Sequence, residues 1–285
     1  MSSLPAATTP WPHVAPNQIE AFFASPELAT RKDEICDIGR RLWQRAYVDG
    51  NGGNISARVA ADLVLCTPTL SSKGFMKPAD LCLVDMEGVQ KAGDKKRTSE
   101  VLMHLEIYKA QPKAVACVHA HPPYATGFAV AGVSPPTCLI PEMEVFCGEV
   151  PVAPYGTPGT LEMSRSVAAL VDQHNTVLMG NHGVVSWAHS IEEAYFKMEI
   201  LDTYCRTALV ARQVSSQSPL IPAPKLRALL AIKQSLDLPD PRYGLSDAEL
   251  EARSGWRPAH AAVSDAATEA LVRRITDDVV RALRR

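Results

Sequence analysis

The sequence has no large excess of charge of either sign. Its 285 residues carry 29 Lys and Arg against 31 Asp and Glu, which gives a formal net charge of −2. Chains that bind nucleic acid or an anionic membrane surface usually carry a clear positive excess. The balance therefore predicts no nucleic-acid partner and no membrane partner, and a small-molecule substrate is expected instead.

The chain also lacks an apolar run that could cross a membrane. Residues 114–141 contain no Asp, Glu, Lys or Arg, but prolines and histidines interrupt them. The N-terminus lacks the basic start and apolar core of a signal peptide. Because 46% of the residues are hydrophobic, the composition predicts a globular cytoplasmic protein with a large core.

A Cys-x-x-Cys pair is absent as well, although the chain has seven cysteines. An odd number without paired spacing does not suggest a disulfide framework. Several of the cysteines lie in apolar, strand-like runs. They are predicted to be buried, reduced thiols in a reducing compartment.

The Gly-Lys-Ser/Thr order of a P-loop is missing, but two other segments have the composition of an anion cradle. Residues 49–58 are rich in glycine and carry Asn54 and Ser56. They follow an amphipathic stretch and precede the apolar residues 63–66, so they are predicted to form a helix-to-strand turn. Residues 67–74 offer a second run of backbone N–H groups and hydroxyls.

Three histidines suggest an open metal site. His119 and His121 are two residues apart, and His182 follows downstream between Gly180 and Gly183. In an extended strand His119 and His121 would point to the same face, and the two glycines fit a tight turn that approaches the site closely. Zinc sites that perform chemistry often use three protein ligands. A half-buried polar pair in a strand would have the same spacing.

An acidic residue precedes these histidines at the start of a predicted helix. Ser99 is the predicted N-cap, which places Glu100 in the first turn. That carboxylate either complements the helix dipole or points at the metal, as a ligand or a general base. His104, one turn later, is either a satisfied helix histidine or a partner behind the metal ligands. The apolar residues at helical spacing are Val101, Leu102, Leu105 and Tyr108.

Taken together, these motifs resemble the class II aldolase and adducin family over about residues 30 to 212. The matching motifs are Gly53-Asn54-Ile55-Ser56, Thr67-Pro68-Thr69, Ser99-Glu100, His119-Ala120-His121, Ala153-Pro154-Tyr155-Gly156 and Asn181-His182-Gly183. The resemblance implies an α/β fold, a three-layer α/β/α sandwich around a central, mainly antiparallel sheet. It also implies a homotetramer with active sites at the subunit interfaces.

The resemblance assigns roles to four side chains. His119, His121 and His182 would hold one divalent metal ion per chain, with zinc expected first and manganese or another ion as alternatives, since imidazole suits several metals. Glu100 would be the catalytic acid/base residue. The implied reaction is the breaking of a carbon–carbon bond through a metal-stabilised enediolate.

Five further residues are expected to bind the anionic part of the substrate. Four of them match the family positions that hold a phosphate or carboxylate, and these are Asn54, Thr69, Thr98 and Ser99. Lys73 lies near the same cradle, where the alternative is a solvated loop lysine. The resemblance thus implies that these positions hold a phosphate or a carboxylate group of the substrate.

The chain departs from the family's sugar-phosphate aldolases at two positions. An ungapped alignment places Ile140 where those enzymes carry a catalytic tyrosine, and Leu70 stands where a glycine is common. Both differences weaken a sugar-phosphate assignment. The candidate replacements for the missing acid are Tyr155, Tyr124 and Tyr204.

Several activities follow from the resemblance. The first expectation is a metal-dependent lyase, an aldolase that cleaves a hydroxy-carbonyl substrate. The alternative is a metal-dependent decarboxylase of a hydroxylated carboxylic acid. A sugar-phosphate epimerase and a non-enzymatic adducin-like binding module rank below these. The adducin-like module ranks low because the adducin head lacks the metal ligands that are intact here.

The chain is predicted to consist of one catalytic domain between two extensions. Residues 1–28 form a proline-rich N-terminal arm, residues 29–214 the class II aldolase/adducin-like domain, and residues 215–285 a linker with a C-terminal helical extension. The domain is expected to end with a long helix over residues 191–214, which Ser190 and Glu193 begin as a capping box. Further helices are predicted over residues 225–236 and 265–283, the latter as a subunit contact or a cover over the site.

Overall fold

One mixed sheet of eight strands forms the middle of the molecule, in the order β4-β3-β2-β1-β5-β8-β7-β6. The computed structural model describes residues 11–256. Every neighbouring pair is antiparallel except β6 and β7, which run parallel. The predicted mainly antiparallel sheet is therefore confirmed. The strands are β1 (Asn54–Arg58), β2 (Leu63–Cys66), β3 (Cys82–Asp85), β4 (Gln90–Ala92), β5 (Ala116–Ala120), β6 (Val152–Ala153), β7 (Thr176–Met179) and β8 (Gly183–Ala188).

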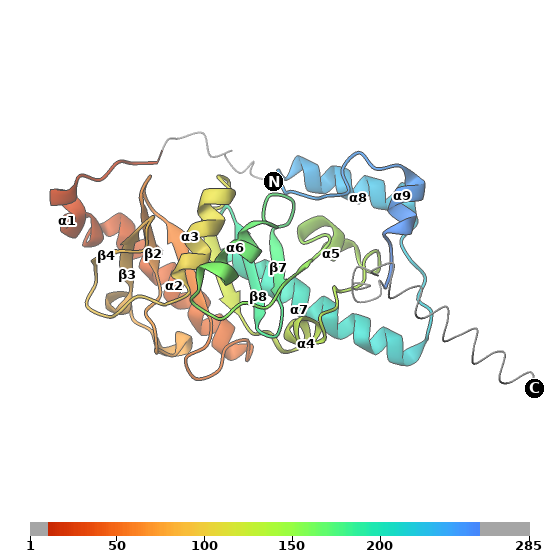
Figure 1. Cartoon of the computed structure of the whole chain (residues 1–285), viewed down its shortest axis with the longest axis horizontal. Coiled ribbons are helices and arrows are strands. Elements are labelled where there is room, and N and C mark those ends of the chain that lie inside the picture. Colours follow the sequence, from red (N-terminus) through yellow and green to blue (C-terminus); the bar gives the residue numbers. More distant parts are fainter. Residues whose placement is uncertain (1–10, 257–285) are drawn as a thin grey trace, which may run out of the picture.

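Helices cover both faces of this sheet (Figure 1). The α-helices are α1 (Ile19–Phe23), α2 (Pro26–Gln44), α3 (Val101–Ala110), α4 (Pro123–Ala131), α5 (Pro141–Phe146), α6 (Leu161–Ala168), α7 (Ile191–Val214), α8 (Ala223–Ser235) and α9 (Asp247–Ala252). The 3-10 helices are η1 (Pro16–Gln18), η2 (Lys73–Phe75) and η3 (Pro78–Asp80).

The two sheet faces bury separate apolar cores, because alternate strand residues point to opposite sides. On one face Leu65 and Val118 pack with residues of α2, α4 and α7. On the other face Val64 and Cys117 pack with residues of α3 and α6. The three-layer α/β/α arrangement predicted from the sequence is thus confirmed.

Several helix boundaries follow from local chemistry. Helix α7 spans the predicted residues, and the Ser190 hydroxyl accepts the Glu193 N–H at 3.2 Å. The start of α3 was predicted wrongly. Its N-cap is Glu100 rather than Ser99, and no side chain caps it. In the turn before the helix, Thr98 Oγ1 accepts the Glu100 N–H at 3.3 Å. Helix α8 begins two residues before the predicted start, with Pro224 in its first turn.

A cluster of buried charges joins the C-terminal helices to the sheet domain. Arg242 forms ion pairs with Asp240 and Glu144, and Lys233 pairs with Asp240. All four side chains are at most 1% exposed. In Figure 1, α8 and α9 lie at the opposite end of the molecule from α1. The helix predicted over residues 265–283 lies outside the described residues, and the division into arm, domain and extension stays a prediction.

The seven cysteines are all buried and none forms a disulfide, as expected from the sequence. Two of them, Cys66 and Cys82, face each other across β2 and β3. Within residues 11–256, no helix has the length and apolar character needed to cross a membrane.

Candidate metal centre

Three histidines from separate parts of the chain meet at one end of β5. His119 lies within β5, His121 follows the strand by one residue, and His182 lies in the turn between β7 and β8. Their ring centroids are 4.7 to 5.2 Å apart. One ligand nitrogen from each ring lies within 4.8 Å of the other two. The structure therefore brings together the three histidines that the sequence singled out.

The strand expected to carry both His119 and His121 is shorter than predicted. β5 ends at Ala120, where its pairing with β1 and β8 stops. The His121 N–H donates instead to the Tyr47 carbonyl at 2.8 Å. The two rings still converge, with centroids 5.0 Å apart, although the His121 backbone is held by the Tyr47 carbonyl and not by strand pairing.

Glycines leave the space that the rings fill. A Cβ on Gly183 would lie 2.6 Å from His121 Cδ2 and 2.7 Å from the Ala120 carbonyl oxygen. A Cβ on Gly180 would lie 3.0 Å from the Ala153 carbonyl oxygen. Both glycines thus allow the close backbone approach that the sequence predicted for this turn.

The three imidazoles are held in the neutral form that binds metal. Burial lowers the pKa of His119, His121 and His182, and for His119 the two neighbouring imidazoles lower it further. His119 Nδ1 donates to the Val184 carbonyl at 2.8 Å, which leaves the Nε2 lone pair free. Nε2 of His119 and of His121 are buried without a hydrogen-bond partner.

Glu100 lies beside these rings. Its two carboxylate oxygens are each 3.6 Å from a ring nitrogen, Oε2 from His119 Nε2 and Oε1 from His182 Nε2. Oε2 accepts a hydrogen bond from Asn54 Nδ2 at 2.7 Å. Burial raises the pKa of the Glu100 carboxyl, opposed by the neighbouring His182 imidazole and by the bond from Asn54.

This arrangement fits a divalent metal ion. Buried polar atoms without a partner are costly in an apolar environment. The orphaned atoms near the three histidines include His119 Nε2, His121 Nε2 and Glu100 Oε1. Three neutral imidazoles with an adjacent carboxylate match the donor set of a catalytic zinc site.

The residues predicted to bind an anion differ in their exposure and in their contacts with Glu100. Asn54 is 1% exposed and Thr98 is 6% exposed, and both contact Glu100 by hydrogen bonds. Thr69 is half-buried and Ser99 is exposed. Asn54 therefore orients the carboxylate, while Thr69 and Ser99 are the more accessible donors.

Lys73 is buried rather than solvated, which corrects the alternative weighed from the sequence. Its side chain is 1% exposed, and Nζ donates to the carbonyls of Asn51 at 3.0 Å and Ser71 at 2.6 Å. Burial lowers the pKa of Lys73 to about 8, against the attraction of Glu100. Lys73 cross-links the two glycine- and hydroxyl-rich segments and places a positive charge close to Glu100.

His104, one helical turn after Glu100, belongs to a buried cluster of polar side chains. Its Nδ1 lies 2.7 Å from Ser56 Oγ, which in turn lies 2.7 Å from the Tyr108 hydroxyl. Burial lowers the pKa of His104 to about 3, so this ring is neutral. His104 Nε2 has no partner among the described residues.

The tyrosines considered as replacements for the family's catalytic acid lie in different environments. Tyr204 is 3% exposed and its hydroxyl donates to the Pro136 carbonyl at 2.6 Å. Tyr124 and Tyr155 are exposed on the surface. Ile140 is the N-cap of α5. Tyr204 is therefore committed to a structural bond.

Leu70 has a backbone conformation that favours glycine. Its φ is +52° and its side chain is 79% exposed. A left-handed conformation is uncommon for a branched residue. The glycine that is common at this position would adopt it without strain.

Two carbonyl groups that hold the histidines escaped the sequence analysis. They belong to Val184, which accepts from the His119 ring, and Tyr47, which accepts from the His121 backbone. No side-chain motif identifies a backbone carbonyl. The alternating side-chain directions along β8, which pairs with β5, are the one signal in the sequence for the position of Val184.

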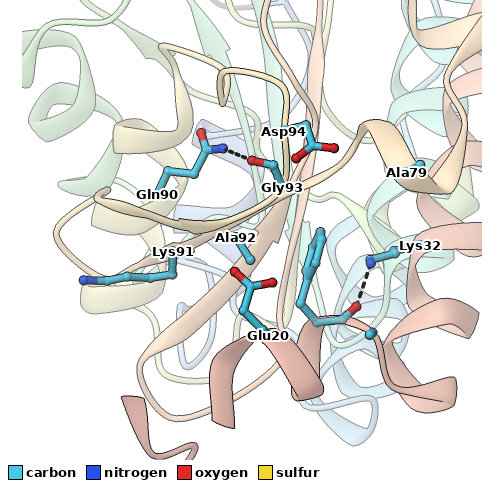
Figure 2. Close-up of a pocket in the computed structure, with 10 residues that line it drawn as sticks. Glu20, Lys32, Ala79, Gln90, Lys91, Ala92, Gly93 and Asp94 are labelled. Carbon is cyan, nitrogen blue, oxygen red and sulfur yellow. Dashed lines mark hydrogen bonds between the residues drawn. The ribbon is translucent and has the colours of Figure 1, made fainter. Parts of the chain in front are cut away.

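A separate surface cavity of about 700 Å³ lies away from the histidines. Figure 2 shows it between Glu20 and the segment that carries Lys91 and Gly93. Lys32 donates there to the Phe23 carbonyl at 2.7 Å, and Gln90 to the Gly93 carbonyl at 2.7 Å. None of the candidate site residues lines it.

Residues 33–209 match the family model of the class II aldolase and adducin N-terminal domain. The chain is 37% identical over 169 residues to an L-fuculose phosphate aldolase of Methanococcus maripaludis, with 59% of this chain and 88% of that protein covered. It is 36% identical over 175 residues to a 3-oxo-tetronate 4-phosphate decarboxylase of Cupriavidus necator, with 60% and 80% covered.

A solved structure has the same architecture. YgbL from Klebsiella pneumoniae, described as an aldolase, epimerase or decarboxylase, superposes with a TM-score of 0.63 at 29% sequence identity. The match covers 70% of this chain and 96% of YgbL. The two structures therefore share their fold over nearly the whole of YgbL.

Proposed function

The chain belongs to the class II aldolase and adducin family, and from that premise we propose that it is a metal-dependent carbon–carbon lyase. The observation that carries the proposal is the approach of three imidazole nitrogens to within 4.8 Å of one another, beside the Glu100 carboxylate. Relatives that share this region include an aldolase and a decarboxylase. Both are lyases, and both break a carbon–carbon bond.

We assign His119, His121 and His182 as the metal ligands, with zinc as the expected ion. These three rings would hold a divalent ion, which would supply Lewis-acid chemistry for the negative charge that develops when the bond breaks. The chain holds the three rings neutral by burial. The Val184 carbonyl fixes which nitrogen of His119 faces the site.

Glu100 is assigned as the group that moves a proton. Its two carboxylate oxygens lie 3.6 Å from ring nitrogens of His119 and His182, within reach of a substrate atom at the cluster. Asn54 fixes the orientation of the carboxylate through its 2.7 Å bond to Oε2. Glu100 would exchange a proton with a hydroxyl group or a carbon atom of the bound substrate.

Thr69, Thr98 and Ser99 are proposed to bind the anionic end of the substrate. Thr69 and Ser99 are the accessible donors, while Lys73 contributes positive charge from a buried position. Phosphate is the favoured anion, since the two relatives are named for phosphorylated substrates. A hydroxyl-lined loop with a nearby cation suits such a group.

Aldol cleavage is the first assignment and decarboxylation the second. The second is favoured by Ile140, which leaves no acid at the position where the family's sugar-phosphate aldolases carry a tyrosine. The decarboxylase relative is nearly as similar as the aldolase, at 36% against 37% identity. Decarboxylation starts from a carboxylate that is already ionised, whereas aldol cleavage needs a group that removes the hydroxyl proton from the departing carbon.

The deciding experiment begins with metal analysis of protein purified without a histidine tag or added metal. The protein is then incubated with L-fuculose 1-phosphate and with 3-oxo-tetronate 4-phosphate, with and without EDTA. Release of an aldehyde supports the aldolase, and release of carbon dioxide supports the decarboxylase. A chain that neither contains nor takes up a divalent ion would contradict the proposal and favour an adducin-like binding module.

We also propose a homo-oligomer, with a tetramer as the expected state, in the cytoplasm. Family resemblance supports the assembly, and the seven unpaired, buried thiols accord with a reducing compartment. Light scattering coupled to size-exclusion chromatography measures the number of chains. A monomer at micromolar concentration would contradict the assembly.

A further inference from the structure

Of the three clustered histidines, only His119 lies within a strand, and His121 is the one whose chain leaves the sheet after it. His119 is paired with Asn54 on β1 and with Val185 on β8. His182 lies in a short turn, where its N–H donates to the Met179 carbonyl at 3.0 Å. His121 lies beyond the end of β5, and its backbone N–H is held by the Tyr47 carbonyl. Something other than strand pairing must fix the chain on its C-terminal side.

The chain leaves His121 along a stiff path. Pro122 and Pro123 follow directly, and α4 begins at Pro123. The ring of a proline fixes its φ, so few backbone angles between His121 and α4 are free to change. A displacement of the first turn of α4 is therefore transmitted to His121.

The first turn of α4 is held by a residue of α7, a helix that lies far from α4 in the sequence but contacts it in the fold. Oδ1 of Asp202, on α7, accepts the backbone N–H of Tyr124 at 2.8 Å and that of Ala125 at 3.0 Å. The helix has no cap of its own, because Pro122 occupies the N-cap position and makes no side-chain cap bond. Asp202 is 6% exposed and supplies the acceptor that a local Ser or Asp usually provides.

The same carboxylate is connected to the other side of His121. The Tyr47 side chain is 4% exposed and lies close to the Asp202 carboxylate, while the Tyr47 backbone carbonyl accepts the His121 N–H at 2.8 Å. Asp202 thus accepts hydrogen bonds from two residues that follow His121 along a stiff path, and it lies beside the residue that holds the His121 backbone.

We propose that Asp202 is a positioning residue of the metal centre, which fixes the His121 ring by anchoring the first turn of α4. The inference rests on the proposed function, since it takes the three histidines as metal ligands. Residues that orient metal ligands from behind typically change metal affinity by about 10- to 100-fold when they are removed. Asp202 is 81 residues from His121 in the sequence, and only the fold brings them together.

The test measures zinc affinity of the metal-free protein by competition with a chromophoric chelator. Asp202→Ala is expected to weaken zinc binding by about 10- to 100-fold. Asp202→Asn retains an oxygen that accepts both N–H groups, so it should restore affinity to within about threefold of wild type. The conservative variant keeps the test valid if Asp202→Ala folds poorly.

Asp85 offers a matched control. Its Oδ1 also accepts two backbone N–H groups, from Glu87 at 3.0 Å and Val89 at 2.8 Å, but in the turn between β3 and β4. Asp85→Ala should reduce thermal stability and leave zinc affinity unchanged. The visible spectrum of the cobalt-substituted protein, which reports ligand geometry, should change for Asp202→Ala and not for Asp85→Ala.

Two results would overturn the inference in distinguishable ways. Wild-type zinc affinity and an unchanged cobalt spectrum in Asp202→Ala would show that Asp202 only stabilises the fold, and the proposed function would stand. Failure of the wild-type chain itself to bind zinc or cobalt would reject the metal centre, and with it both the proposed function and this role of Asp202.

Discussion

Asn54 Nδ2 lies 2.7 Å from Glu100 Oε2, so β1 holds the carboxylate that precedes α3. Two residues further along β1, Ser56 Oγ lies 2.7 Å from Nδ1 of His104, four residues beyond Glu100. Side chains on one strand face repeat every two residues, and those on one helix face repeat every three or four. The two periods coincide here and form a short polar ladder between strand and helix. This ladder fixes Glu100 relative to His119, which is paired with Asn54.

Replacing one clustered histidine should abolish metal retention. We expect His182→Ala to retain less than about a tenth of the wild-type metal, because two imidazoles rarely hold a zinc ion alone. Elemental mass spectrometry after dialysis measures the metal per chain. His189→Ala is the control. His189 does not belong to the histidine cluster, and its Nδ1 lies 3.9 Å from Glu193 Oε2. Equal metal content in both variants would contradict the ligand assignment.

Removing the charge of Glu100 should affect the rate more than the metal. Glu100→Gln keeps an oxygen that accepts the Asn54 bond but cannot take up a proton. We expect the turnover rate to fall by about 10²- to 10⁴-fold while the protein still carries about one metal ion per chain. Steady-state kinetics and metal analysis are made on the same preparation. A variant with a wild-type rate would rule out Glu100 as the acid/base residue.

The stability contributed by Lys73 should depend on pH in a defined direction. Burial lowers the pKa of Lys73 from 10.5 to about 8, so between these values the unfolded chain binds a proton that the folded chain has released. Rising pH therefore favours the folded state, by about 3 kcal/mol at most over this window.

The comparison for Lys73 is with Lys73→Met, which lacks the titrating group. The difference in free energy of unfolding, wild type minus variant, should rise between pH 8 and pH 10.5. Urea unfolding with a reductant present measures both proteins, and effects of other titrating groups cancel in the difference. A difference that stays constant across this range would contradict a lowered pKa.

The buried ion pairs of the C-terminal helices should matter more than a surface pair. Arg242→Met leaves Glu144 and Asp240 buried without their guanidinium partner, and we expect a loss of about 3–5 kcal/mol in the free energy of unfolding. Arg227→Met removes an exposed pair with Asp247 and should cost at most about 1 kcal/mol. Urea unfolding compares the two variants. Equal losses would show that the buried network adds nothing beyond a surface pair.

Much of the site was predictable because local sequence carries its chemistry. The spacing of His119 and His121, the glycines around His182 and the cap of α7 are local signals, and each points to the element or turn found. Errors occurred where a contact outside the local segment decided the outcome. The pairing of β5 with β1 and β8 stops before His121, and Thr98 Oγ1 accepts the Glu100 N–H in the turn before α3.

The sequence by itself determined the donor types, since the spacing of the histidines is a local property, and its motifs determined the family resemblance, which implied the mainly antiparallel α/β fold. Only the tertiary structure decided that Lys73 is buried, that Asn54 binds Glu100 and that Asp202 contacts the turn after His121. These contacts join residues 22 to 78 positions apart. They form only when the sheet and its helices bring distant segments together, and no local pattern encodes which carbonyl or carboxylate will lie opposite a given group.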